Sequence, residues 1–226
     1  MRDELRENRT PGAVLADALK AAASLVLFGF GVFLTIRADI GAAPWDVLNL
    51  GLSGTLGILY GSASIAVSLS IVIIDVLLKE PIGVAMILDA LVVGKAVDFF
   101  NRFLPVPPPA SLAAAIPMML AGLTVMAYSQ YFYMNAALGC GPRDTLLVAL
   151  AKRVRRVPIG AISVALLGTA TLVGWLLGGP VGIGTLICAF CTGPIMQLAF
   201  RTVGFDATAV RHQRLGETLR VLFPKR

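Results

Sequence analysis

The sequence predicts an all-helical membrane protein made of two related halves. Hydrophobic residues make up 57% of the 226 positions and charged residues only 14%, whereas ordinary soluble domains carry about 25% charged residues. The apolar residues gather in runs of about 20, the length that crosses roughly 30 Å of hydrocarbon. A motif of Gly, Pro and Asp also occurs twice, at 41–46 and at 139–144. We therefore expect lipid to be the main solvent and the chain to carry an internal duplication.

Six apolar runs are long enough to be transmembrane helices: 14–36, 58–78, 82–100, 112–134, 159–177 and 181–200. Pro81 with Gly83, and Gly179 with Pro180, mark tight turns between the second and third runs and between the fifth and sixth. We expect about six transmembrane helices in a single membrane domain covering 1–226.

The two halves align through residues that set backbone geometry. At an offset of 98 positions, Ala38, Gly41, Pro44 and Asp46 match Ala136, Gly139, Pro142 and Asp144. After one inserted residue the offset is 99, and Gly61, Gly83 and Gly94 match Gly160, Gly182 and Gly193. Because Gly and Pro have special backbone angles, such matches are harder to obtain by chance than matches of Leu or Val. We predict repeat one at about 14–103, a Pro-rich linker at 104–110, and repeat two at about 111–201.

The predicted topology gives the two repeats opposite orientations. Each repeat holds three spans, and an odd number of spans inverts the second copy about an axis in the membrane plane. Cytoplasmic loops are rich in Lys and Arg, and here these residues gather at 1–9, at Lys79, at 143–156 and from Arg201 onward. We therefore expect a multi-pass protein with both termini in the cytoplasm. The mixed charges of residues 1–9 and the lack of a cleavage site argue against a signal peptide.

A short helix is expected to begin at each motif, after the backbone residues Gly41 and Gly139. Pro44 and Pro142 suit the first position of a helix, where a missing N–H costs nothing. The helices from these prolines are too short to span the bilayer. Each must lie along the interface, or enter the membrane and return as a re-entrant element.

The motif acids Asp46 and Asp144 fall in the first helical turn, and two roles are open for them. A carboxylate there can accept backbone N–H bonds and offset the helix dipole, which is worth about 1 kcal/mol. Alternatively, both helix starts lie near the mid-plane, where the acids bind a cation or carry protons, or where free N–H groups hold an anionic substrate. Trp45 and Arg143 occupy equivalent positions, and we expect an interfacial anchor and a cytoplasmic topology charge, respectively.

The third apolar run carries the charged residues Asp89, Lys95 and Asp98. An isolated ionised group near mid-bilayer costs about 2.5 to 3.5 kcal/mol on insertion scales, so these residues are expected to face protein or water. Lys95 and Asp98, or Asp98 and Arg102, have the spacing at which ion pairs form on one helix face. A structural pair and a transport role are both open.

The sequence offers no catalytic, metal or cofactor constellation. The one histidine, His212, lies in the basic tail, where it builds neither a Ser-His-Asp triad nor a His-rich metal site. Cys140, Cys188 and Cys191 are best explained as small packing residues. The net charge of +6 comes from basic residues that flank apolar runs, which argues against nucleic acid. The expected partners are the lipid bilayer, an unidentified small molecule or ion, and a second copy in a homo-oligomer; no enzymatic activity is expected.

The tail at 202–226 is expected to be an amphipathic, basic, cytoplasmic segment. Val210, Leu215, Leu219 and Leu222 fall roughly on one helix face, and arginines lie elsewhere. Such a helix lies on the inner membrane surface with its apolar face toward the acyl chains.

The motif residues carry a family resemblance. The runs at 41–53 and 139–146 resemble those of the YczE/YitT group of bacterial integral membrane proteins, with the closer likeness to the YczE branch. The resemblance implies a multi-spanning protein of the bacterial cytoplasmic (inner) membrane. It does not include the soluble C-terminal domain of YitT-type members, so functions attached to that domain are not expected here.

These expectations combine into a small transporter or permease-like protein with a binding site between inverted repeats. The candidate residues for substrate binding or ion coupling are Asp46, Asp144, Asp89, Lys95 and Asp98. The alternative is a non-transporting membrane protein that assists the assembly or regulation of a partner complex.

Overall fold

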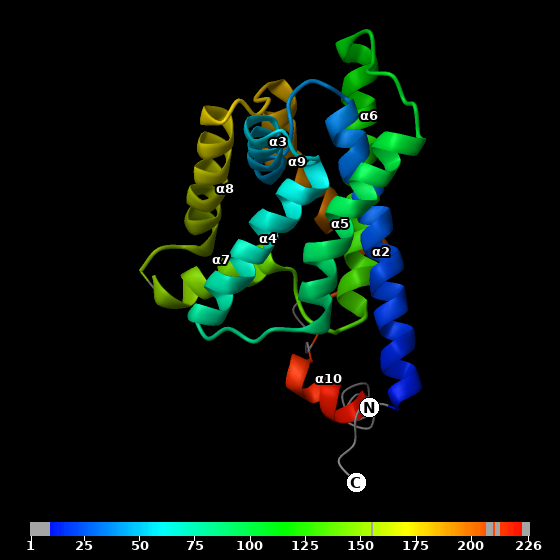
Figure 1. Cartoon of the computed structure of the whole chain (residues 1–226), viewed down its shortest axis with the longest axis vertical. Helices are drawn as coiled ribbons and strands as arrows, with labels where there is room; N and C mark the ends of the chain where they lie inside the picture. The colour runs from blue at the N-terminus through cyan, green and yellow to red at the C-terminus, as the bar shows by residue number, and fades with distance from the viewer. Residues whose placement is uncertain (1–9, 155, 207–209, 211–212, 223–226) are drawn as a thin grey trace.

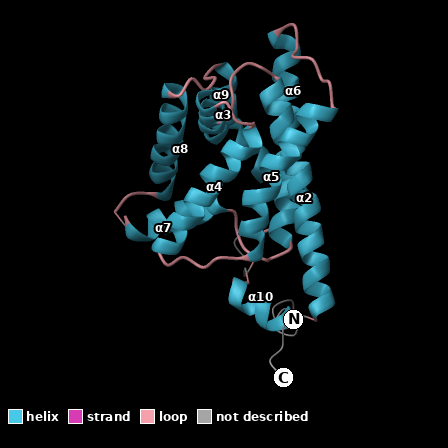
Figure 2. Ribbon diagram, viewed as in Figure 1, coloured by secondary structure: helices cyan, strands magenta, loops and turns pink. Residues whose placement is uncertain are grey.

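The computed structural model describes residues 10–154, 156–206, 210 and 213–222. Within this part of the chain the structure consists of helices and loops and contains no strand (Figure 2). The prediction of an all-helical fold is therefore confirmed for the described residues. The N-terminal charges through Arg9, and His212, lie outside them.

The described helices form two successive sets of four, followed by a short C-terminal helix. The first set is α2 (Pro11–Arg37), α3 (Pro44–Leu56), α4 (Tyr60–Leu77) and α5 (Val84–Phe103). The second set is α6 (Leu112–Asn135), α7 (Pro142–Arg153), α8 (Ile159–Leu176) and α9 (Ile183–Thr202). The last helix is α10 (Leu215–Leu222). Each set has a long helix, a short helix, and then helices of 18 and 20 residues, so the order of helix lengths repeats.

Local sequence explains where several of these helices begin. Thr10 caps α2, because its Oγ1 accepts the N–H of Ala13 at 3.3 Å, and Pro11 follows at the first helical position. α3 and α7 begin at Pro44 and Pro142, as the motif predicted. The motif therefore sets the same helix start in both halves.

Turns at equivalent positions of the two halves also share their backbone shape. Positive φ angles occur at Asp39 (53°) and Ala137 (56°), at Gly41 (107°) and Gly139 (127°), and at Lys79 (58°) and Gly178 (85°). Residues other than Gly rarely adopt such angles. Their recurrence after α2 and α6, and after α4 and α8, shows that the two halves fold alike locally.

Each of the six predicted spans coincides with a helix, and α2, α4, α6, α8 and α9 are long and apolar enough to cross a membrane. α5 is not among these five, because its 20 residues include Asp89, Lys95, Asp98 and Arg102. Large apolar side chains lie on the surface, as Phe190 of α9 does with 76% exposure. Such a surface is typical of contact with lipid. The chain is thus a membrane protein with several apolar helices.

α2 and α6 pack side by side along one side of the molecule, at the right of Figure 1. A β-carbon on Gly122 would lie 2.7 Å from the carbonyl oxygen of Gly31, so small residues permit this close crossing. α5 packs on α2, and α9 packs on α6. Each short helix packs on a helix of the other half, α3 on α8 in the upper part of Figure 1 and α7 on α4 about midway down the view.

The two ends of the described chain lie together at the lower end of Figure 1. α10 packs beside the start of α2, where Leu222 contacts a core cluster that includes Val14. The N–H of Leu215 donates to the carbonyl oxygen of Ile82 at 2.7 Å. Leu219, expected on the same apolar face as Leu222, is exposed. The tail helix is thus held by the turn between α4 and α5 as well as by α2.

Candidate functional site

The loops before the two motifs cross the molecule in the same way. The carbonyl oxygen of Ile40 accepts the N–H of Gly184, at the start of α9, at 2.7 Å. The carbonyl oxygen of Leu138 accepts the N–H of Ala85, at the start of α5, at 3.0 Å. These four positions are equivalent in pairs, so the same hydrogen bond occurs twice with the roles of the halves exchanged.

Gly41 and Gly139 are required at these crossings for two physical reasons. Their φ angles of 107° and 127° are strained for any residue with a β-carbon. A β-carbon on Gly41 would also lie 2.6 Å from the backbone nitrogen of Gly182, and one on Gly139 would lie 2.8 Å from the Cα atom of Gly83. The motif glycines therefore let each loop touch the opposite half.

Asp46 lies inside the molecule near the start of α3. Its side chain is buried, with 3% exposure, and its Oδ1 accepts a hydrogen bond from the Tyr60 hydroxyl at 2.7 Å. The Asn49 Nδ2 group donates to the same hydroxyl oxygen at 3.4 Å. A side-chain network from α3 and α4 thus closes over this motif acid.

Asp144, at the equivalent position of α7, has a different environment. Asp144 is exposed, whereas Asp46 is buried. Gln130 of α6 contributes one long hydrogen bond, from Nε2 to Oδ2 at 3.4 Å. The position equivalent to Tyr60 is Ile159, which has no hydroxyl group to donate. The second motif acid is therefore left more open than the first.

Trp45 and Arg143 contact each other across the two halves. The Arg143 guanidinium carbon lies 5.1 Å from the centroid of the Trp45 ring, a cation–π geometry, and both residues are half-buried. The expected roles, an interfacial anchor and a topology charge at the cytoplasmic edge, did not include this contact and stay predictions. They lie at equivalent positions, so the starts of the two motif helices meet here.

Arg143 is the cation around which the candidate acids gather. It interacts electrostatically with Asp46 of α3, Asp89 of α5 and Asp144 of its own helix. Three carboxylates from both halves thus lie within electrostatic range of one guanidinium group, although no ion pair joins Arg143 to any of them among the described residues. No group of three or more His, Cys, Asp or Glu residues that could hold a metal ion is found in the part of the chain that the structure describes.

Asp89 and Asp144 converge beside Gly141. A β-carbon on Gly141 would lie 3.1 Å from Oδ2 of Asp89 and 3.6 Å from Oδ2 of Asp144. The Tyr133 hydroxyl of α6 interacts electrostatically with both carboxylates. Its side chain is only 2% exposed, and its oxygen has no hydrogen-bond partner among the described residues. Two acids therefore converge at the second motif, within electrostatic range of a buried hydroxyl that has no partner among the described residues.

Lys95 and Asp98 lie away from this cluster and do not form the expected pair. Asp98 instead accepts the N–H of Gly61, in the first turn of α4, through Oδ1 at 2.9 Å. Lys95 is exposed, and no ion pair links it or Arg102 to Asp98 within the described residues. The i,i+3 spacing was misleading because Asp98 accepts its hydrogen bond from the backbone N–H of Gly61 on the neighbouring helix and not from Lys95.

The α4–α5 pair and its counterpart, the α8–α9 pair, are packed differently. α4 and α5 meet at two glycines, where a β-carbon on Gly94 would lie 2.8 Å from the carbonyl oxygen of Gly61. At the equivalent Gly160 and Gly193, a β-carbon would meet no atom within 4 Å. The first pair is therefore closed, and the second pair is open.

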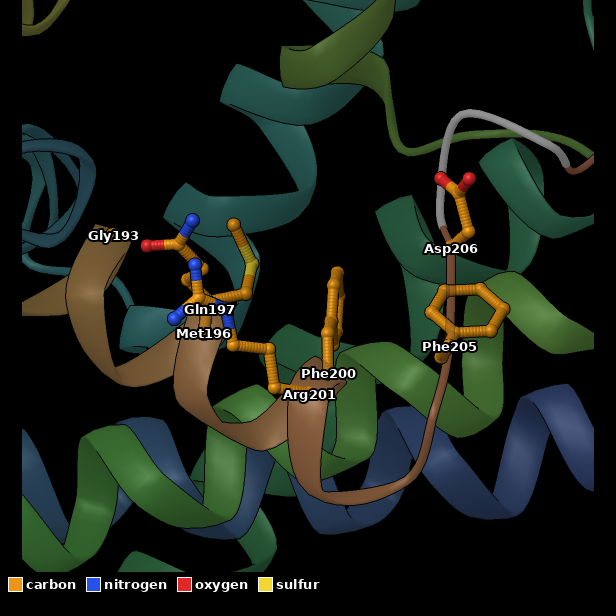
Figure 3. Close-up of a pocket in the computed structure, with 7 residues that line it drawn as sticks. All are labelled: Gly193, Met196, Gln197, Phe200, Arg201, Phe205 and Asp206. Carbon is orange, nitrogen blue, oxygen red and sulfur yellow. The ribbon is translucent and has the colours of Figure 1, made fainter.

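A crevice of about 440 Å³ lies where α9 is uncovered. Figure 3 shows its lining along α9 and on the segment that follows: Gly193, Met196, Gln197, Phe200, Arg201, Phe205 and Asp206. Gly193 and Gln197 are equivalent to Gly94 and Asp98, which in the first half contact α4. The crevice thus occupies the position at which α8 would pack if the second half were closed like the first.

Three residues of the site were not singled out by sequence reasoning: Tyr60, Tyr133 and Gly141. The two tyrosines carry a polar tip at the end of an apolar run, a placement that could have identified them as partners for buried acids. Gly141 sits inside the second motif, where the first motif has Ala43. That difference between the copies was the available signal for a space beside Asp144.

Comparison with known proteins identifies the family. Residues 17–201 match the model of the "Family of unknown function (DUF6198)". The "Uncharacterized membrane protein YczE" of Bacillus subtilis (strain 168) is 30% identical over 183 residues, which cover 78% of this chain and 82% of that protein. An "Uncharacterized protein" of Haemophilus influenzae is 28% identical over 174 residues, covering 77% of this chain and 78% of that protein. The "Uncharacterized protein YyaS" of Bacillus subtilis (strain 168) is 25% identical over 185 residues, covering 79% and 89%.

No solved structure matches the chain. The family model covers most of the two helix sets, from α2 to the end of α9. The YczE resemblance seen in the motif runs is therefore confirmed. This chain belongs to the DUF6198 family and is a YczE-type membrane protein.

Proposed function

We propose that this protein is a small transporter or permease-like protein of the bacterial cytoplasmic membrane, with its binding site between two inverted repeats. The observation that carries the proposal is the difference between equivalent helix pairs, α4–α5 closed over Gly61 and Gly94 and α8–α9 open at Gly160 and Gly193. Inverted repeats that adopt different conformations provide alternating access when the two conformations are exchanged. Of the acids near Arg143, Asp89 belongs to α5, and Asp46 and Asp144 lie in the first turns of α3 and α7, which pack on α8 and α4.

The inverted arrangement is supported by the crosswise packing of the halves. α3 lies near the upper ends of α4 and α8 and α7 near their lower ends (Figure 1), and each short helix packs on a helix of the other half. With α5 counted as the third span, each repeat crosses the bilayer three times. Two of the charged residues of α5, Asp89 and Asp98, are then acceptable in the membrane because they face protein rather than lipid, whereas Lys95 is exposed.

The short helices fit re-entrant elements better than interfacial ones. Pro44 and Pro142 at their starts are buried, whereas Leu56 and Arg153 at their other ends are exposed. Burial therefore decreases along both helices from the centre outward. Such elements are tolerated in a membrane when protein surrounds their inner ends.

Both termini are assigned to the cytoplasm. α10 and the start of α2 lie at the same end of the molecule as Lys79, Lys152 and Arg153, near the turn between α4 and α5 and the end of α7 (Figure 1). The excess of basic residues at this end favours the cytoplasmic side.

Cysteine cross-linking in membranes tests the proposed exchange of conformations. In a chain with Cys140, Cys188 and Cys191 replaced by Ala, we expect Gly160→Cys with Gly193→Cys to form an intramolecular disulfide under mild oxidation. The matched control pairs Gly193→Cys with Val164→Cys, an exposed position of α8, and should cross-link at least about tenfold more slowly because thiols must approach to within bonding distance. Equal, slow cross-linking of both pairs would mean that the second half never closes, and would favour the non-transporting alternative.

A further inference from the structure

We propose that Asp89, Asp144 and the Tyr133 hydroxyl form a subsite for an ammonium group, either the ammonium ion itself or the protonated amine of an organic substrate. This inference rests on the proposed transport function and names the substrate class. It concerns the part of the central cluster that lies beside Gly141.

The cluster has more carboxylates than positively charged groups, which favours the binding of a cation. Asp46, Asp89 and Asp144 contribute three carboxylates, and Arg143 is the one guanidinium that interacts with all of them. The Arg143 group is already stacked on Trp45. Carboxylates inside a low-dielectric protein require compensating charge, and Arg143 supplies one positive charge for the three.

The two halves of the cluster differ in whether an acid is available. Asp46 is sealed by the Tyr60 hydroxyl at 2.7 Å, so its oxygen is occupied. Asp89 receives no hydrogen bond within the described residues, and Asp144 receives only the 3.4 Å bond from Gln130. The open acids are therefore those at the second motif.

Tyr133 supplies the observation that points to a ligand. Its hydroxyl is buried and lacks a partner, although it interacts electrostatically with both open acids. A buried hydroxyl without a hydrogen bond is destabilising, so a native structure that keeps one beside two carboxylates needs a group to satisfy it. An ammonium group beside the two carboxylates would donate to their oxygens and offer a further N–H to the hydroxyl.

Gly141 lets the two open acids approach each other. A β-carbon at this position would lie 3.1 Å from Oδ2 of Asp89 and 3.6 Å from Oδ2 of Asp144, so both carboxylates come up to the same stretch of backbone. An ammonium group has three N–H donors in a compact tetrahedral arrangement, which matches two carboxylates and one hydroxyl. An anion would be repelled by the same acids.

Binding to the purified full-length protein in lipid nanodiscs tests the subsite. The probes are ammonium chloride, ethylamine hydrochloride and putrescine dihydrochloride, with sodium chloride and sodium acetate for comparison. We expect saturable binding of at least one amine or of ammonium by calorimetry, and none of sodium or acetate. Preference for ethylamine or putrescine identifies an organic amine, and preference for ammonium chloride identifies the free ion.

Substitutions assign the binding to these residues. Asp89→Asn and Asp144→Asn should each weaken affinity about tenfold or more, because each removes a charge-assisted hydrogen bond. Tyr133→Phe should weaken it about threefold to tenfold while leaving both acids in place, so it tests the subsite even if an acid variant fails to fold. Asp39→Asn, on an exposed acid outside the cluster, is the matched control and should bind like the native protein.

The outcomes separate this inference from the transport proposal. Absence of any amine or ammonium binding, or binding that survives all three substitutions, overturns the subsite even where the Gly160–Gly193 cross-link forms. Binding that depends on Asp89 and Asp144 supports the subsite even where that cross-link fails, and then only the transport proposal is lost.

Discussion

The two motif helices begin with Pro and carry Asp at the third position, yet their acids have different surroundings. Asp46 is closed in by Tyr60 of α4, whereas Asp144 is open and has only a long bond from Gln130. Ile159, which stands where the first half has Tyr60, removes the hydroxyl donor from the second half. The duplication has kept the backbone and changed the side chains that cover the acid.

The packing of the helices differs between the halves in the same way as the environment of the acids. The half that covers its acid also has the more closely packed helix pair. The half that seals Asp46 also joins α4 to α5 through Gly61, Gly94 and the Asp98 carboxylate. The half that leaves Asp144 open also leaves α8 apart from α9. Closure of the acid and closure of the helix pair therefore accompany each other, which is expected if both belong to one conformational change.

The largest effects should come from the motif glycines, where the two halves are alike. Gly41→Ala and Gly139→Ala should each lower the free energy of unfolding by about 2 to 5 kcal/mol, since each adds left-handed strain and a backbone clash. Denaturant titration in detergent micelles measures this loss. If only one of the two substitutions lowered the free energy of unfolding, the two loops that contain Gly41 and Gly139 would not be structurally equivalent.

The hydrogen bond on Asp46 should matter more than the one on Asp144. Tyr60→Phe should lower the free energy of unfolding by about 1.5 to 3 kcal/mol, because it removes a donor from a buried carboxylate. Gln130→Leu should cost less than about 1 kcal/mol, because its 3.4 Å bond reaches an exposed acid. The same unfolding assay compares the two variants, and equal costs would contradict the sealed and open assignment.

The equivalent glycines of α4 and α8 provide the next contrast. Gly61→Ala should cost about 1 to 3 kcal/mol, because a β-carbon there meets the backbone of Gly94 and the Asp98 carboxylate. Gly160→Ala should be neutral or stabilise by up to about 1 kcal/mol, because its surroundings are open and Ala favours the helix. Thermal unfolding of both variants measures the difference. A large loss of thermal stability in Gly160→Ala would contradict this prediction, because it would mean that Gly160 packs closely against another part of the protein.

The helices could be predicted from the sequence because their signals are local. Apolar length and the prolines Pro44 and Pro142 act within one segment, and the observed helices begin at both prolines. The recurrence of Gly and Pro at fixed offsets indicated two related halves, and the structure adds that Gly41 and Gly139 both have positive φ angles. Nothing in these signals depends on how the helices pack.

The site could be predicted only in part, because its contacts join distant segments. Asp46, Asp89 and Asp144 were all candidates, and the structure brings them around Arg143. The contact of Arg143 with Trp45 was not predicted, since it depends on the crossing of two helices far apart in the chain. The Lys95–Asp98 pair failed for the same reason, because the partner of Asp98 is a backbone N–H of another helix.

The outer ends of α3 and α7 also differ between the two halves, here in the charge of the side chains that hold them in place. Each is tied to the turn that follows α4 or α8 of the other half. At the end of α3, the Thr55 hydroxyl donates to the carbonyl oxygen of Leu177 at 2.9 Å. At the end of α7, Arg153 donates to the carbonyl oxygen of Leu78, and Lys152 and Arg153 bind Glu80 at 2.7 and 3.2 Å. One tie is neutral and the other is charged.

The smallest expected effect is therefore a pH dependence that only the charged tie produces. The hydrogen bond from Lys152, with that from Arg153, holds the pKa of Glu80 below its usual range. A carboxyl group whose pKa is lowered by folding stabilises the protein above its unfolded pKa, and this stability is lost as the pH falls through the lowered value. Between about pH 6 and pH 3, the native protein should lose about 0.5 to 1 kcal/mol more stability than Glu80→Gln, a modest amount because Lys152 is 58% exposed. Thr55→Val should show the same pH profile as the native protein, and a profile that stayed unchanged in Glu80→Gln would mean that the charged tie contributes nothing.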